Sequence, residues 1–167
     1  MITLIMKNGL NMKLKYIVLK INIVAGMLIL LPALPLISSE MEGNYVGWER
    51  CDVCHADISQ GWQKGRHAHA IESLKKEGQE NLPACVACHV TGYEQAGGFI
   101  DYELTPEMAN VQCEACHGPG SEHLDNPMGK NMVKAPAVDT CRRCHTEGQD
   151  PGFDYKERVT GVHGPQQ

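Results

Sequence analysis

Apolar residues along this chain form short stretches, and one stretch has the spacing of an amphipathic helix. Between residues 56 and 77 they recur at steps of three to four positions or longer, and Gly78 follows as a stop signal, which predicts a helix there. A second helix is expected to begin at Thr105-Pro106 and to run into residues 113–117, with threonine as the N-cap and proline at the first helical position. The sequence after residue 98 has the composition of a short strand, which is compatible with a small β-hairpin near 93–104. We therefore expect a mainly α chain with extensive loops.

The first 39 residues have the composition of an export signal. Residues 1–20 contain four lysines and no acidic residue, an apolar run follows from residue 21, and the segment ends in small residues. This pattern predicts a signal peptide over residues 1–39, followed by a single domain over 40–167. An uncleaved N-terminal anchor is the alternative, because residues 21–37 reach the short limit for a membrane span. We expect an exported protein that is periplasmic or extracellular, in preference to one that is membrane-anchored and faces outward.

A five-residue motif, C-x-x-C-H, occurs four times and uses all eight cysteines of the chain. It is the signature of covalent c-type haem attachment. Two cysteines on one helical turn can each form a thioether with one vinyl group of a haem, and the histidine that follows ligates the iron from the proximal side. The expected attachment residues are Cys51, Cys54, Cys85, Cys88, Cys113, Cys116, Cys141 and Cys144, and the expected proximal ligands are His55, His89, His117 and His145.

Zinc sites are an alternative explanation of paired cysteines. Here, however, each pair is followed directly by histidine and no cysteine is left over, so we expect four covalently attached haem c groups. The predicted domain of about 128 residues would be divided among four haems, which is too little protein for an ordinary apolar core. The expected fold is a small multihaem cytochrome c fold in which packed haems form the core.

The predicted mature chain is acidic. Without the four lysines of the leader, 11 basic residues remain against 20 acidic ones, a balance of about −9. An acidic exported protein is not expected to bind nucleic acid. Its charge favours redox protein partners with basic patches, and we expect these to be other multihaem cytochromes. A membrane tether would come from the N-terminal segment.

Four histidines lie outside the motifs: His67, His69, His123 and His163. Their number equals the number of haems, so each haem could have a second, distal histidine ligand. Residues two apart on a helix point about 200° apart, so the first two would have to serve different haems. Methionine is the other axial ligand to consider, but it more often fills gaps in packing. The methionines in question are Met108, Met128 and Met132.

Several stretches between the motifs resemble the tetrahaem cytochrome c-554 family. They are Trp62, residues 67–74 (HAHAIESL), residues 85–93 (CVACHVTGY), Gly97-Gly98 and residues 111–120 (VQCEACHGPG). The resemblance covers about residues 45–125. It implies an extracytoplasmic tetrahaem protein with haems in closely packed, stacked pairs.

The resemblance also implies a distal ligand for three of the haems. By position, His123 looks like the distal ligand of the haem on His55, and His67 like that of the haem on His145. The haem on the third motif takes its distal histidine from a late segment in the family, and His163 is the histidine that this chain has there.

The second haem, on His89, is the one left open in the family's best-known member. Here His69 stands where that member has no histidine, so this haem could instead be closed. Whether the iron is open or ligated decides whether substrate chemistry can occur there, and the sequence leaves both alternatives standing.

Three functions are compatible with these features. Haems with two histidine ligands leave no place for substrate, which favours an electron carrier that relays single electrons between redox partners. A subunit of an extracellular cytochrome filament is the second hypothesis, compatible with the Gly- and Pro-rich tail and the isolated His163. The third is reduction of nitric oxide, nitrite or hydroxylamine at a five-coordinate haem on His89. No acid–base pair typical of a reductase site is evident, so no catalytic residue is assigned and the carrier is preferred.

Overall fold

The structure is a computed structural model that describes residues 43–164. The predicted signal peptide or anchor over residues 1–39 lies outside the described residues. These described residues belong to one compact unit of the chain. None of the helices in the described part has the length and apolarity that crossing a membrane requires.

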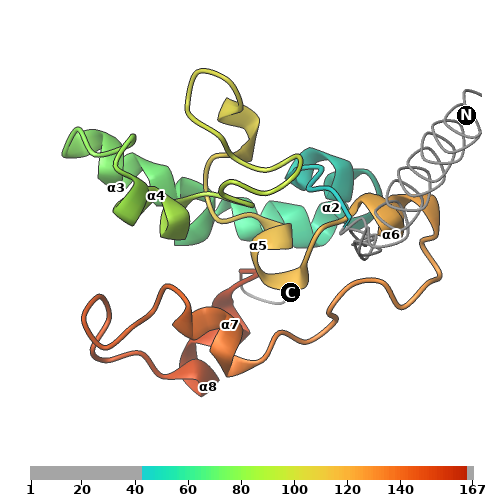
Figure 1. The fold of residues 1–167 in the computed structure, drawn as a ribbon. Helices are drawn as coiled ribbons and strands as arrows, with labels where there is room; N and C mark the ends of the chain where they lie inside the picture. Colours follow the sequence, from blue (N-terminus) through green and yellow to red (C-terminus); the bar gives the residue numbers. More distant parts are fainter. Residues whose placement is uncertain (1–42, 165–167) are drawn as a thin grey trace, which may run out of the picture. The chain divides into compact units, whose positions relative to one another are not determined.

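The described chain consists of short helices joined by loops and contains no β-sheet (Figure 1). This confirms the prediction of a mainly α fold with extensive loops. The α-helices are α2 (Trp48–Gln63), α3 (Ala70–Lys76), α4 (Pro83–His89), α5 (Cys113–His117), α6 (Ser121–Asp125), α7 (Val138–Arg142) and α8 (Tyr155–Arg158). Single 3-10 turns are η1 (Arg66–His69), η2 (Pro106–Met108) and η3 (Val159–Gly161).

The helix predicted over residues 56–77 is present in two pieces. α2 begins earlier, at Trp48, includes the first C-x-x-C-H motif and bends at His55, whose φ of −121° and ψ of 40° are not helical. It ends before Gly65, which has an extended backbone with a ψ of 163°. The chain resumes as η1 and α3, and α3 stops just before Gly78, which is left-handed with a φ of 62°. The stop is therefore where the sequence predicts it, and the break falls at a glycine inside the pattern.

The helix expected from Thr105 to the third motif is also interrupted. Pro106 begins η2, and the backbone becomes extended at Ala109, whose ψ is 157°. Asn110 then adopts a left-handed conformation with a φ of 72°, which a right-handed helix cannot accommodate. α5 starts afresh at the third motif and ends before Gly118, whose φ is 88°. The expected start and stop are both present, but the helix between them is not continuous.

The β-hairpin considered near residues 93–104 is not formed, and this part of the prediction is corrected. Gly92 and Gly98 pack backbone against backbone, with no room for a side chain between them. This close approach turns the chain before a ladder of paired residues can extend. One isolated antiparallel bridge, between Val90 and Ala109, lies beside the turn.

A small apolar core packs between α3, α4 and the chain that follows α4. The two helices lie side by side (Figure 1). The core residues each expose 7% or less of their surface, and they are Ile71, Leu74, Val86, Val90, Phe99, Met108 and Ala109. Val86 comes from the second motif, and Cys85 packs against the cluster. In the described residues, the first, third and fourth motifs contribute nothing to this cluster, so other contacts must position them.

Candidate haem-binding sites

The four C-x-x-C-H motifs lie on α2, on α4, on α5, and on the end of α7 with the turn after it. Residues three apart on a helix are neighbours on its surface. In the first three motifs, both cysteine side chains therefore project to the same side of their helix. Two thioether bonds to a single haem need this arrangement.

Two of the spare histidines face a motif histidine with nearly parallel rings. The ring centres of His55 and His123 are 6.4 Å apart, and the ring planes differ by 19°. The ring centres of His117 and His163 are 5.9 Å apart, also with 19° between the planes. His123 is carried by α6, whereas His163 follows η3 in the tail. The tail reaches this place because its backbone passes directly over Gly61, where any side chain would collide with the His163 carbonyl.

A third pair joins His67 in η1 to His145, which follows α7. Their ring centres are 6.0 Å apart and their planes cross at 66°. Phe153 stacks on His145 with 4.6 Å between ring centres. Burial, and next the proximity of His145, lower the pKa of His67, and burial and the proximity of His117 do the same for the pKa of His163. Both shifts favour neutral imidazole, which is the form that binds metals.

The spacing of the three pairs fits an iron between each pair of rings. A metal–imidazole bond is about 2.0 Å long and the ring centre lies roughly 1 Å beyond the nitrogen, so two imidazoles on one iron have ring centres roughly 6 Å apart. The observed separations run from 5.9 to 6.4 Å. These donor sets therefore fit a haem with two axial histidines at the first, third and fourth motifs.

Three of the four motif histidines have their Nδ1 atoms engaged in hydrogen bonds. Nδ1 of His89 lies 2.6 Å from the carbonyl oxygen of Ala70, and Nδ1 of His117 also faces a backbone carbonyl. Nδ1 of His145 lies 2.9 Å from a carboxylate oxygen of Asp150. A bond of this kind fixes the orientation of a metal-ligating imidazole and leaves Nε2 available for the metal.

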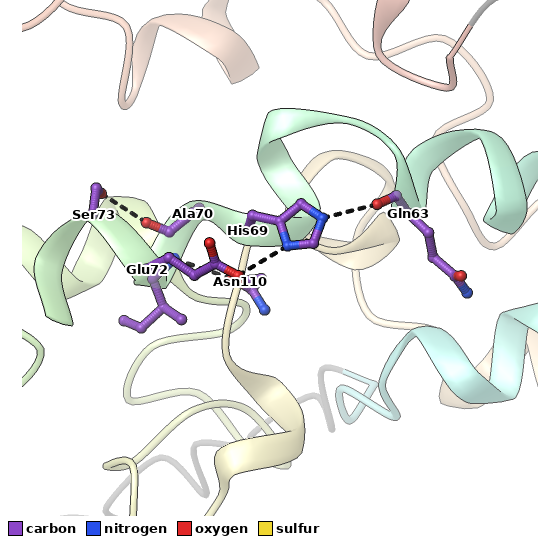
Figure 2. A network of polar contacts seen from close by, with 7 residues as sticks. Gln63, His69, Ala70, Glu72, Ser73 and Asn110 are labelled. Carbon is purple, nitrogen blue, oxygen red and sulfur yellow. Dashed lines mark hydrogen bonds and ion pairs between the residues drawn. The ribbon is translucent and has the colours of Figure 1, made fainter. Parts of the chain in front are cut away.

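His69 is placed differently from the other three spare histidines. Its Nδ1 lies 3.1 Å from Glu72 Oε1, and its Nε2 lies 3.0 Å from the carbonyl oxygen of Gln63 (Figure 2). Its side chain is 55% exposed. Both ring nitrogens therefore have protein partners. Within residues 43–164, the His69 ring does not face His89, so it does not occupy the place of a distal ligand to the haem on His89.

Cysteines of different motifs lie next to one another in two places. The thiols of Cys51 and Cys113 share a hydrogen bond, which lowers the pKa of Cys51 and raises that of Cys113. Burial, together with a hydrogen bond that the Cys144 thiol donates to Cys88, raises the pKa of Cys144 to about 12. The first motif is thus adjacent to the third, and the second to the fourth. α2 and α5, which carry the first and third motifs, are in contact.

Two acidic residues at these sites were not among the predicted site residues. Glu114 lies inside the third motif and is only 1% exposed, and Asp150 is bonded to His145. The signal in the sequence is an acidic residue within five positions of a motif histidine. Acidic residues are common in this chain, so the signal alone could not have selected these two.

This chain is similar in sequence and in fold to known cytochromes c554. Residues 50–118 match the family model of cytochrome c554 and c-prime. Cytochrome c-554 of Nitrosomonas europaea is 33% identical over 87 residues, a match that covers 43% of this chain and 37% of the length of that protein. The solved structure of the reduced state of cytochrome c554 from the same organism matches with a TM-score of 0.58 and 24% identity, covering 75% of this chain and 86% of that chain. Residues 50–118 therefore resemble the cytochrome c554 family in sequence, and the fold of the chain resembles that of the solved cytochrome c554 structure.

Proposed function

We propose that residues 40–167 form a single tetrahaem domain that relays single electrons between redox partners. The observation that carries this proposal is that three motif histidines each face a second histidine at 5.9 to 6.4 Å. Haem supplies the one-electron chemistry. Two axial histidines saturate the iron and leave no position for a substrate. What remains for the protein is to attach the haems, orient their ligands and keep them close together.

The proposed ligands follow from the motifs and the facing histidines. Thioether attachment is assigned to Cys51, Cys54, Cys85, Cys88, Cys113, Cys116, Cys141 and Cys144. Proximal ligation is assigned to His55, His89, His117 and His145. Distal ligation is assigned to His123 opposite His55, to His163 opposite His117 and to His67 opposite His145.

Contacts between motifs support a relay in which neighbouring haems exchange electrons. The proximity of the Cys51 and Cys113 side chains supports a short path between the first and third haems. The guanidinium of Arg143, inside the fourth motif, donates to the carbonyl of Ala115, inside the third, at 2.8 Å. The second and fourth motifs are adjacent at Cys88 and Cys144. The proposed order of neighbours is therefore first, third, fourth and second.

The location and partners in this proposal rest on chemistry and charge. Haem thioethers are formed outside the cytoplasm, so the protein is proposed to be periplasmic or extracellular. Its acidic balance favours redox partners with basic patches, such as other multihaem cytochromes. A filament in which a neighbouring subunit supplies a histidine has less support, because His163 already faces His117 of its own chain.

A second candidate function is binding or reduction of a small ligand at the haem on His89. Both ring nitrogens of His69 are engaged elsewhere, and no other histidine ring faces His89 among the residues that the structure describes. These observations favour a five-coordinate iron there. Nitric oxide, nitrite and hydroxylamine are the ligands considered.

Carbon monoxide added to the ferrous protein separates the two candidates. If the haem on His89 is open, one haem equivalent binds carbon monoxide and shifts its visible spectrum. If no haem responds, all four irons are saturated. In that case the second candidate function is excluded and the carrier remains.

Replacement of His123 tests the carrier proposal. His123→Ala should convert the haem on His55 from low spin to high spin and add one equivalent of carbon monoxide binding. Leu124→Ala is the matched control, because Leu124 is the next residue on α6 and is 37% exposed. A His123→Ala protein that retains the wild-type spectrum would contradict the proposed ligation.

A further inference from the structure

Glu114 is a buried carboxylate that accepts backbone N–H groups from two segments, one distant and one nearby in the sequence. Its Oε1 accepts from Val46 at 3.0 Å and from Gly120 at 2.7 Å. Its Oε2 accepts from Val46 at 3.1 Å and from Gly47 at 2.8 Å. Residues 46 and 47 precede Glu114 by 67 or more positions, whereas Gly120 follows it by 6. A buried charge is tolerated when hydrogen bonds satisfy it, and here backbone donors do so.

Gln112, on the other side of Cys113, continues the same set of contacts. Its Oε1 accepts the backbone N–H of Trp48 at 2.8 Å, while its Nε2 donates to the carbonyls of Glu107 and Ala109. Three consecutive backbone N–H groups, of residues 46 to 48, are thus held by the two side chains that flank the first cysteine of the third motif.

The segments that meet at Glu114 carry both proposed ligands of one haem. Residues 46 and 47 lead directly into α2, which bears His55. Gly120 leads directly into α6, which bears His123. We propose that Glu114, a residue of the third motif, is the positioning residue that holds His123 opposite His55 and holds the first haem against the third. This inference rests on the proposed assignment of His55 and His123 to one haem.

The chemistry of the carboxylate explains why a close analogue could not replace it. An ionised carboxylate is an acceptor at both oxygens, so it can receive all of these N–H groups. Its hydrogen bonds are roughly twice as strong as those between neutral groups. A glutamine would turn an NH2 group toward at least one backbone N–H and leave that donor buried without a partner. The segments would then separate, and the one at Gly120 would take His123 with it.

Glu114→Gln is compared with Glu122→Gln, which removes the same charge from an exposed position on α6. In the haem-loaded Glu114→Gln protein, part of the haem on His55 should become high spin and bind carbon monoxide, giving up to one equivalent more than in wild type. The reduction potential of this haem should change with it. The control should keep the wild-type spectrum. A residue with a merely structural role would lower the unfolding temperature while every haem kept its spin state.

A second variant perturbs the same contact without touching the motif. A Cβ on Gly120 would lie 3.0 Å from Glu114 Oε1 and 3.1 Å from a methyl of Val46, so Gly120→Ala should produce the same high-spin signal at the same haem. If the Glu114→Gln protein does not attach its haems, Gly120→Ala still tests the positioning role.

The His123→Ala protein separates this inference from the proposed function. If it turns high spin while the Glu114→Gln and Gly120→Ala proteins stay low spin with wild-type potentials, the positioning role is overturned and the ligation stands. If the His123→Ala protein keeps the wild-type spectrum, the assignment of His123 as a ligand of the haem on His55 is wrong, and the positioning role of Glu114 falls with it.

Discussion

His145 and His89 each end a C-x-x-C-H motif, but the surroundings of the two histidines differ in three respects. His145 is faced by His67 at 6.0 Å, bonded to the Asp150 carboxylate at 2.9 Å and covered by Phe153. His89 is bonded to a backbone carbonyl at 2.6 Å, and no histidine ring faces it in the described part of the chain. In the proposed assignment, the motif supplies the attachment sites and one ligand of each haem. A second ligand and the hydrogen-bond partner of the motif histidine would come from other segments and would set the character of each haem.

One short segment helps to build both surroundings. Residues 67–73 include His67, which faces His145, and Ala70, whose carbonyl accepts from His89. The segment therefore lies between the second and fourth motifs, whose thiols are in contact. Substitutions within residues 67–73 should affect either the haem on His145 or the haem on His89, depending on which residue is replaced. They therefore test how the surroundings of the two histidines differ.

Replacement of His67 should have the largest effect. His67→Ala should leave the haem on His145 with a single axial ligand, so about one haem in four becomes high spin and binds carbon monoxide. His69→Ala is the matched control, because His69 lies two residues further along and its side chain is exposed. This variant should leave the low-spin fraction unchanged. The visible and electron paramagnetic resonance spectra measure both. If His69→Ala instead produced a new high-spin haem, His69 would be a ligand and the haem on His89 would be closed in the wild type.

A smaller effect is expected at Asp150. A carboxylate on Nδ1 makes the imidazole more electron-rich, which stabilises ferric over ferrous iron and lowers the reduction potential. Asp150→Asn keeps an acceptor oxygen but removes the charge. The potential of one haem should rise by on the order of 40 mV, which corresponds to about 1 kcal/mol for a one-electron couple.

Spectroelectrochemical titration measures this shift, and Glu147→Gln provides the control. Glu147 is an exposed acid in the same loop, so its loss tests the effect of charge alone. Equal shifts in the two variants would mean that the hydrogen bond to His145 has no influence of its own.

The smallest effect is expected at Ser73. Its hydroxyl lies 3.4 Å from Nδ1 of His89, whereas the Ala70 carbonyl lies at 2.6 Å. Because the backbone carbonyl remains in any side-chain variant, Ser73→Ala should shift the potential of the haem on His89 by less than Asp150→Asn shifts that of the haem on His145. A larger shift would show that Ser73 is the main partner of His89.

The sequence predicts these features unequally, for physical reasons. The motifs depend on local spacing, so they could be read directly. The helical character also followed from periodicity, but the break at Gly65 did not, and this break decides that His67 and His69 lie in a 3-10 turn. The hydrogen bonds of Glu114 could not be predicted, because they join groups 67 or more residues apart. Long-range polar contacts leave no periodic trace in the sequence.

The passage of the tail over Gly61 has a consequence for how such proteins could diverge. Gly61 has no side chain that could ligate iron and lies outside every motif, yet a methyl group there would displace the backbone that presents His163 to His117. One nucleotide change of glycine to a small residue could thus open an iron without altering any ligand. New ligand-binding haems could therefore arise within an electron carrier by drift at positions that carry no chemistry themselves.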